Sequence, residues 1–172
     1  RRLGAGGMGS VYLAQHELID RQVALKVLHP SLGQKPNARK RFLREARAAS
    51  KVKHPGVVEI HDVAFAGDHV YFVMELLHGS DLADHLAAAG RLSWPQAFPL
   101  LLQIAQALAA AHAAGIVHRD IKPSNCFLVT AADGTERVKV VDFGIAKLVA
   151  DEGTPADPLT GTGEVFGTIG YM

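Results

Sequence analysis

The segment 118–125, which reads His-Arg-Asp-Ile-Lys-Pro-Ser-Asn, constrains the fold more than any other part of the chain. Pro123 keeps it out of a helix interior, because proline lacks an amide donor and clashes with the preceding turn. Apolar runs precede and follow it, so we predict a loop held between two buried elements, where catalytic groups are often placed. Asp120 could accept a proton, Lys122 could neutralise a phosphate and Asn125 could ligate a metal. A polar turn could contain the same residues, so this segment alone does not decide.

The composition is that of a soluble globular protein. The 172 residues are 48% hydrophobic and 20% charged, with a net charge of +1, which gives no indication of nucleic-acid binding. The single cysteine, Cys126, excludes an internal disulfide and a cysteine-based zinc site. The most apolar stretch, 97–117, contains Pro99 and Gln103, so we predict a buried amphipathic helix rather than a membrane span. The chain begins with Arg1 rather than Met, and we expect a fragment of a longer protein.

The first residues combine closely spaced glycines with β-prone sequence. Gly4, Gly6 and Gly9 follow the Gly-x-Gly-x-x-Gly spacing, which lets a backbone approach phosphate groups. A dinucleotide-binding fold would need a helix directly after these glycines, whereas residues 10–14 alternate as a strand does. We therefore predict a strand–turn–strand arrangement in which residues 22–28 form a following strand.

Lys26 interrupts that apolar strand, which is costly unless the lysine pairs with an anion or faces solvent. Residues 38–53 are predicted to form a helix with Phe42 and Ala46 on its apolar face. The opposite face is basic, and a solvated helix face is favoured over a nucleic-acid patch. Glu45 is the lone acid of this helix and lies near its apolar side, which makes it a candidate partner for Lys26.

The remaining periodicity separates a β-rich half from a helical half. Strands at 57–60 and 70–75 complete the first half, and residues 76–79 are predicted to form a linker. Beyond the linker the composition shifts to helices rich in Ala and Leu. The predicted elements there are a helix over 81–89, a helix over 94–114 with Ser93 as N-cap and Gly115 as C-cap, a hairpin of 126–129 with 137–141, and a mobile loop over 150–163.

These motifs occur in the order of the protein-kinase signature set: the glycine loop, residues 23–26, Glu45, the segment 118–125 and residues 142–144. The chain over its whole length therefore resembles a eukaryotic-type Ser/Thr protein kinase. The residues most similar to the bacterial kinases of this type are 7–12 and 160–168.

The resemblance implies an α+β, protein-kinase-like bilobal fold. An N-terminal ATP-binding lobe of antiparallel strands with one helix would span 1–77, and the first part of a mainly helical catalytic lobe would span 78–172. The chain stops before the Ala-Pro-Glu motif of this family, so we expect that lobe to be incomplete and the fragment by itself to be poorly stable and largely inactive. The spacing from Asn125 to Asp142 is longer than usual, which we attribute to the hairpin turn at 132–135.

The resemblance also implies ATP and Mg²⁺, or Mn²⁺ in its place, as cofactors. Asp120 would orient the substrate hydroxyl and accept its proton, and Lys122 would offset charge on the transferred phosphoryl group. Lys26 would hold the α- and β-phosphates while paired with Glu45. The implied metal ligands are Asn125 and Asp142, and the implied ATP-binding residues are Leu3, Gly4, Gly6, Gly9, Val11, Ala24, Lys26, Met74, Glu75, Leu77, Asp81 and Phe127.

The resemblance further implies regulation by phosphorylation of the chain itself. Thr160 and Thr162 match paired phosphothreonines of the bacterial kinases, and a phosphate there could pair with Arg119. Thr168 matches a threonine that favours Ser/Thr substrates. The implied partners are protein substrates and a second copy for trans-autophosphorylation, with no nucleic acid and no membrane contact within this segment. The expected location is cytoplasmic, in a signalling protein whose membrane anchor, where there is one, lies outside this chain.

Three other readings compete with a Ser/Thr protein kinase. A nucleotide-binding pseudokinase is disfavoured because the signature lysine, aspartates and asparagine are all present. A small-molecule phosphotransferase of the aminoglycoside-kinase type is disfavoured by Lys122 and by the segment around Thr168. A dinucleotide-binding enzyme is the weakest alternative, because a strand rather than a helix is predicted after the glycines.

Overall fold

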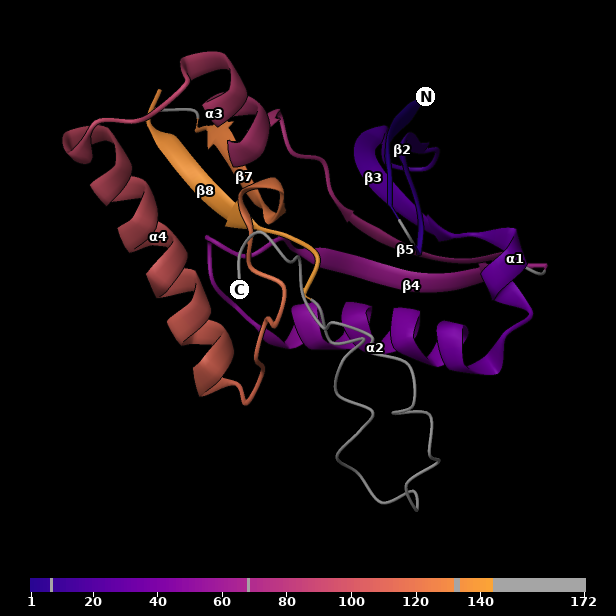
Figure 1. Cartoon of the computed structure of the whole chain (residues 1–172). Coiled ribbons are helices and arrows are strands. Elements are labelled where there is room, and N and C mark those ends of the chain that lie inside the picture. The colour runs from indigo at the N-terminus through magenta and orange to yellow at the C-terminus, as the bar shows by residue number, and fades with distance from the viewer. Residues whose placement is uncertain (7, 68, 132–133, 144–172) are drawn as a thin grey trace.

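The first half of the chain is a five-stranded antiparallel sheet with helix α2 on one face (Figure 1). The computed structural model describes residues 1–6, 8–67, 69–131 and 134–143. The strand order of this sheet is β1-β2-β3-β5-β4. The elements of this half are β1 (Arg2–Ala5), β2 (Gly9–His16), β3 (Arg21–Leu28), α1 (Pro30–Gly33), α2 (Pro36–Lys51), β4 (Ile60–Ala66) and β5 (His69–Glu75).

The second half combines helices with a three-stranded antiparallel sheet of order β6-β7-β8, and α4 lies beside β8 (Figure 1). Its elements are β6 (Gly79–Asp81), α3 (Leu82–Ala89), α4 (Trp94–Ala113), the 3-10 turn η1 (Pro123–Asn125), β7 (Cys126–Thr130) and β8 (Glu136–Val140). The predicted α+β architecture, with an antiparallel sheet first and helices after it, is confirmed. The hairpin predicted before residue 142 is confirmed as β7 and β8.

The alternation of β3 decides which way Lys26 points. Successive side chains of a strand face opposite sides of a sheet, so Lys26 shares a face with Ala24 and Leu28, and all three are buried. Leu28 packs in one cluster with Phe42 and with other buried residues of α2 and β5. The face that carries Lys26 is therefore the face that α2 covers, and an outward-facing lysine is excluded.

A second apolar cluster joins the end of α2 to the later helices and strands. Ala49 of α2 packs there with Ala107 and Ala111 of α4, with Val140 at the end of β8 and with Phe143 three residues further on. The region boundary at 77/78 stays a prediction, because contacts of this kind join the two regions rather than divide them. The cluster brings the two segments that carry Glu45 and Asp142 toward each other.

Several boundaries differ from the sequence-based expectation. Residues 30–33, predicted as loop, form the short helix α1, and Pro36 starts α2 two residues early because proline suits the first helical turn. The strand predicted at 57–60 is wrong: β4 begins at Ile60, and Val57 makes a single parallel bridge with Val140. The β-branched residues at 57 and 58 are buried in loop backbone instead.

The predicted linker over 76–79 is wrong at its last residue. Gly79 begins β6, in which it pairs with Val129 of β7. An added Cβ at Gly79 would overlap the carbonyl oxygen of Leu128, so the close approach of β6 to β7 needs a glycine. The caps of α4 are nearly as predicted: Ser93 forms a capping box, whereas Ala114 is the C-cap and Gly115 follows it with φ 73°.

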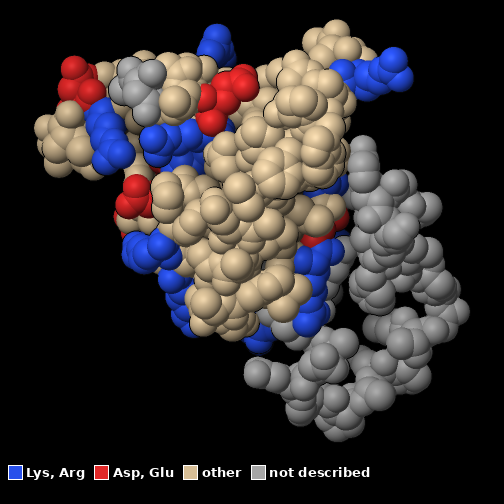
Figure 2. Space-filling model, turned by 90° about the vertical axis from the view of Figure 1, so that its left-hand side faces the viewer, with Lys and Arg blue, Asp and Glu red and all other residues tan. Residues whose placement is uncertain are grey.

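Helix α4 exposes several large apolar side chains. Its surface in Figure 2 is free of charged residues, and Trp94, Phe98, Leu101 and Leu102 are all exposed on it. Such a face is typical of a surface that packs against further protein. Within the described residues, none of the helices is both long and apolar enough to cross a bilayer.

Candidate active site

Lys26 is the centre of a buried ionic cluster. Its Nζ lies 2.6 Å from Oε1 of Glu45 and 2.7 Å from Oδ1 of Asp142. The predicted contact between Lys26 and Glu45 is therefore confirmed. The contact with Asp142 was not predicted, because Asp142 follows β8, far along the chain from β3.

Two carboxylates share this one ammonium group. Burial by itself lowers the pKa of Lys26, but the charges of Asp142 and Glu45 outweigh burial and raise it above its ordinary value. Burial raises the pKa of Glu45, Lys26 opposes that change and the charge of Asp142 adds to it. The Asp142 side chain is 49% exposed, so the cluster presents negative charge to solvent at one point, where a cation would be attracted.

The loop after α4 brings three predicted catalytic and metal-binding residues together. Asp120 Oδ2 lies 3.2 Å from Nζ of Lys122. The Nδ2 group of buried Asn125 donates to the carbonyl oxygen of Asp120 at 2.8 Å and to its Oδ2 at 3.3 Å. The main-chain N–H of Val141 donates to the carbonyl oxygen of Asn125 at 3.0 Å. The loop is therefore bonded to the residue that precedes Asp142.

His118 joins the same loop to the chain around Asp142, a role that we did not predict. Its Nε2 lies 3.0 Å from the carbonyl oxygen of Val141, and its Nδ1 lies 3.3 Å from the main-chain N–H of Asp120. The N–H of Asp120 must donate, so Nδ1 accepts and Nε2–H donates to Val141. The ring also packs against Phe143 at a centroid distance of 4.8 Å. The sequence signal for this role is a histidine that ends an apolar run directly before a polar loop.

We expect stability to fall in acid because of His118. Burial lowers its pKa below the ordinary value of 6.5, although the Val141 bond and nearby carboxylates oppose this change. A lowered pKa means that the unfolded chain binds the proton more readily, so this contribution to stability is complete above pH 6.5 and is lost as the pH falls below it. Urea unfolding at pH 7.5 and 5.5 should show a larger loss for the wild type than for His118→Phe. An equal loss in both would contradict a buried neutral imidazole.

Two residues of the site have unusual backbone conformations. Arg119 has φ 62° and Asp142 has φ 55°, the left-handed region that residues other than glycine rarely adopt. Such conformations cost free energy and persist where surrounding contacts hold them, often at functional sites. Here the bonds of His118 and Asn125 hold the neighbouring main chain.

The glycine loop is compact and lies against the end of β3. The N–H of Gly6 donates to the carbonyl oxygen of Gly9 at 2.8 Å. An added Cβ at Gly9 would overlap the carbonyl oxygen of Val27, so this position requires glycine. Gly4 and Gly6 have open space around them, which leaves room for a ligand beside the loop.

The predicted ATP-binding residues lie in two groups. In the first sheet, Ala24 pairs with Met74 across β3 and β5, and Val11 of β2 lies opposite Lys26. In the second sheet, Asp81 pairs with Phe127. The full placement is Leu3 and Gly4 on β1, Gly6 in the following loop, Gly9 and Val11 on β2, Ala24 and Lys26 on β3, Met74 and Glu75 on β5, Leu77 between β5 and β6, Asp81 on β6 and Phe127 on β7.

Asp81 also has a structural role. Its Oδ1 accepts a hydrogen bond of 2.9 Å from the main-chain N–H of Asp84, so Asp81 is the N-cap of α3. This capping does not exclude a contact with a ribose, which stays a prediction. The joint binding of a nucleotide by the two groups of residues also stays a prediction.

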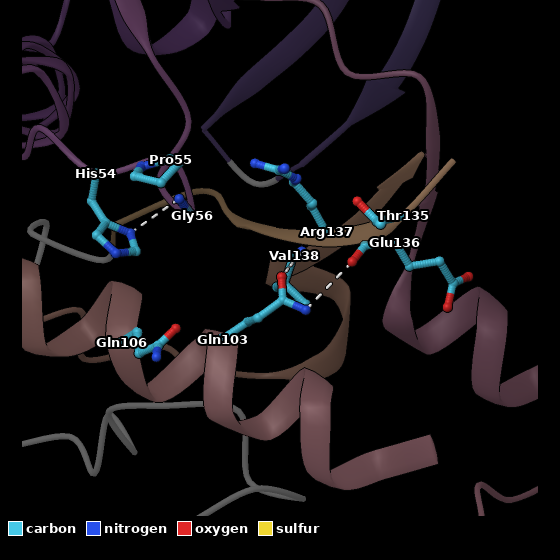
Figure 3. Close-up of a pocket in the computed structure, with 9 residues that line it drawn as sticks. All are labelled: His54, Pro55, Gly56, Gln103, Gln106, Thr135, Glu136, Arg137 and Val138. Carbon is cyan, nitrogen blue, oxygen red and sulfur yellow. Dashed lines mark hydrogen bonds between the residues drawn. The ribbon is translucent and has the colours of Figure 1, made fainter. Parts of the chain in front are cut away.

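A pocket of about 260 Å³ lies away from the predicted site residues (Figure 3). It is lined by residues 54–56, by Gln103 and Gln106 of α4, and by residues 135–138. The Gln103 carboxamide bridges two main-chain groups of β8: Nε2 donates to the carbonyl oxygen of Glu136 at 3.4 Å, and Oε1 accepts from the N–H of Val138 at 2.9 Å. This pocket therefore marks a junction of α4 and β8.

The predicted regulatory and substrate residues, Thr160, Thr162 and Thr168, lie outside the described residues, as does the loop predicted over 150–163. Arg119, their predicted partner, is exposed at the start of the loop. Within the described part of the chain, no group of three or more His, Cys, Asp or Glu side chains could hold a metal ion. Magnesium commonly binds through one or two carboxylates with phosphates and water, so a sparse protein site suits it.

The structure has a buried lysine paired with a helix glutamate and a loop that joins an aspartate to a lysine and an asparagine, an arrangement typical of phosphoryl-transfer sites. The chain belongs to the protein kinase family, because the protein kinase domain matches residues 1–172. It is similar to the serine/threonine-protein kinase pkn2 of Myxococcus xanthus, with 46% identity over 100% of this chain and 20% of that protein. It is also similar to PknJ of Mycobacterium tuberculosis, with 42% identity over 99% of this chain and 28% of that protein.

Solved structures show the same fold. The crystal structure of the Mycobacterium tuberculosis PknI kinase domain matches 84% of this chain with a TM-score of 0.68 and 35% identity, and the match covers 58% of that chain. A double mutant of the same domain matches 96% of this chain with a TM-score of 0.70 and 34% identity, over 66% of that chain. The kinase-like fold implied by the sequence is therefore confirmed. The chain spans only part of the length of each of these relatives.

Proposed function

We propose that this chain provides the nucleotide-binding lobe and the catalytic loop of an ATP-dependent protein Ser/Thr kinase. The observation that carries the proposal is the buried Lys26, held by Glu45 and Asp142. A lysine held in this way could bind phosphates. It pairs across the strands with Val11, which follows the glycine loop in the sequence. Regions 1–77 and 78–172 would then act as the ATP-binding lobe and part of the catalytic lobe.

The donor atoms of the site suit Mg²⁺. Asp142 offers a half-exposed carboxylate, and Asn125 uses its Nδ2 for hydrogen bonds, so its Oδ1 is the atom for a metal. Both are hard oxygen donors of the kind that magnesium prefers. When bound, the metal would neutralise charge on the ATP phosphates. Lys26 would then pair with phosphate as well as with Glu45.

Asp120 would act on a substrate hydroxyl, and its contacts support this role. Its carboxylate is oriented by Lys122 and Asn125, as a general base should be. Lys122 would meanwhile offset negative charge on the transferred phosphoryl group. Because it also lies beside Asp120, it would help to orient the carboxylate that activates the substrate hydroxyl. The leaving ADP would be stabilised by Lys26 and the metal.

Protein substrates are supported by the names of the relatives, which are serine/threonine-protein kinases, and by Lys122 in the loop. The test is a magnesium-dependent assay of the full-length protein with radioactive ATP, offered either a Ser/Thr protein such as casein or an aminoglycoside. Label on serine and threonine of protein is the expected result. Label on the aminoglycoside alone would indicate a small-molecule phosphotransferase instead.

Regulation by phosphorylation of Thr160 and Thr162 is part of the proposal. Both lie in a segment, 151–164, with acidic residues and no basic ones, so a phosphate there needs a basic partner such as Arg119. We expect the double variant Thr160→Ala, Thr162→Ala to lower the rate about 10- to 100-fold, because a charge-assisted pair of this kind contributes about 1.5–3 kcal/mol. Thr154→Ala in the same segment is the matched control. A double variant as fast as the control, after autophosphorylation, would remove this part of the proposal.

A second copy of the protein would act as the phosphorylating partner.

A further inference from the structure

The side chain of Glu75, at the end of β5, joins segments that are distant in the sequence. Its Oε1 accepts from Nζ of Lys139 at 2.6 Å and from the main-chain N–H of Glu59 at 2.7 Å. The main-chain N–H of Glu75 in turn donates to the carbonyl oxygen of Glu59 at 3.0 Å. Glu75 therefore connects β5, the segment before β4, and β8.

Lys139 completes this junction from β8. Besides the bond to Glu75, its Nζ lies 3.5 Å from the carbonyl oxygen of Val57. The side chains of Lys139 and Glu75 are only 18% and 20% exposed, so solvent and salt screen the pair less than they screen a surface ion pair. A carboxylate oxygen shared by two donors is also more restricted than one in a single exposed pair.

The outer edge of β8 is held in the same region by main-chain bonds. The N–H of Val140 donates to the carbonyl oxygen of Gly56 at 2.8 Å, and the N–H of Val58 donates to the carbonyl oxygen of Val140 at 3.1 Å. Further along this edge the Gln103 carboxamide takes the place of a neighbouring strand (Figure 3). The side-chain pair Lys139–Glu75 links β8 to the end of β5.

This junction joins the two chain segments that are connected to the acids that bind Lys26. The segment 56–58 follows α2, which carries Glu45, and β8 leads through Val141 directly to Asp142. A shift of β8 relative to segment 56–58 would change the separation of Glu45 and Asp142, and with it the position of Lys26. The end of β5 belongs to the same unit, and Val23 of β3 pairs with Glu75 there.

We propose that Lys139 and Glu75 form a positioning pair that fixes the end of β5 and segment 56–59 to β8, and so sets the place of Asp142 relative to Lys26. Neither side chain needs to touch the nucleotide. The inference rests on the proposed function for its effect on nucleotide binding, although the junction itself is a property of the fold. Glu75, which was predicted only as an ATP-binding residue, thereby gains a separate structural role for its side chain.

The test is a double-mutant cycle in the full-length protein with Lys139→Met, Glu75→Gln and both together. Methionine keeps the length of the lysine stem, and glutamine keeps an oxygen for the N–H of Glu59. We expect each single variant to weaken binding of a fluorescent ATP analogue with magnesium about fivefold, as for a partly buried ion pair. The double variant should bind no more weakly than either single one. Lys40→Met, which removes an exposed lysine on α2, is the matched control and should bind as the wild type does.

A second measurement separates the pair from the proposed function. Hydrogen exchange without nucleotide should be faster in segment 56–59 and in β8 for Lys139→Met, and unchanged for Lys40→Met. The proposed pair would be overturned if Lys139→Met had the nucleotide affinity and the exchange rates of the wild type. It would also be overturned if the losses of affinity in the two single variants multiplied in the double variant. A folded wild type that binds no nucleotide would contradict the proposed function. The pair would then be tested by hydrogen exchange alone: faster exchange in Lys139→Met supports it, and unchanged exchange contradicts it.

Discussion

Replacing Asp120 by asparagine in the full-length protein is expected to lower phosphoryl transfer to protein by about 10²- to 10⁴-fold, the contribution typical of a general base. Asparagine has nearly the same shape but cannot accept the proton of the substrate hydroxyl. The substitution also removes the negative charge of Asp120, whose carboxylate lies 3.2 Å from Nζ of Lys122. Nucleotide affinity should change little, because the neighbours of Lys26 remain in place.

The measurement is the rate of label transfer from ATP to protein, together with the affinity for an ATP analogue. Asp84→Asn, which changes an exposed aspartate on α3, is the matched control and should keep the wild-type rate. Near-normal transfer by Asp120→Asn would remove the proposed kinase mechanism. A loss of nucleotide binding equal to the loss of rate would instead show that the loop had lost its structure.

Replacing Lys26 by methionine is expected to reduce transfer about a hundredfold or more, as when a preorganised donor to developing charge is removed. This variant should weaken nucleotide binding as well, unlike Asp120→Asn. It should also destabilise the fold by about 3 kcal/mol at neutral pH, because removal of one partner leaves an uncompensated buried charge. Glu45 and Asp142, which share Lys26 at 2.6 and 2.7 Å, would then face each other without a cation.

The pH dependence of that loss gives a sharper test. Burial already raises the pKa of Glu45, and Lys26 opposes this change, so loss of the lysine raises the pKa further. An acid with a raised pKa in the folded state contributes stability at low pH that is lost as the pH rises. The stability deficit of Lys26→Met should therefore be smaller at pH 5 than at pH 7.5. Lys53→Met, on an exposed lysine, should show no such trend, and a constant deficit in Lys26→Met would contradict the buried cluster.

Local sequence predicted most of the secondary structure because its signals act over a few residues. Ser93 and Gln96 form a capping box within one helical turn, and Ala131 forms main-chain hydrogen bonds with Gly134 and Thr135 between β7 and β8. Where the prediction was wrong, the local signal was weak or ambiguous. β6 has only three residues, too few to show the alternation of apolar and polar residues that identifies a strand. The β-branched residues at 57 and 58 are equally suited to a buried loop.

Residue types and order also determined the family and one contact of the site. A lysine in an apolar strand needs a partner, and Glu45 was the lone acid near the apolar side of the next helix, so this pair could be predicted from chemistry alone. The tertiary structure decided the rest. Lys26 meets Asp142 across 116 residues, Glu75 meets Lys139 across 64, and His118 meets Val141 across 23. No periodic pattern encodes such contacts, because they depend on how β8 packs against α4 and segment 56–58, and that packing is a property of the whole core.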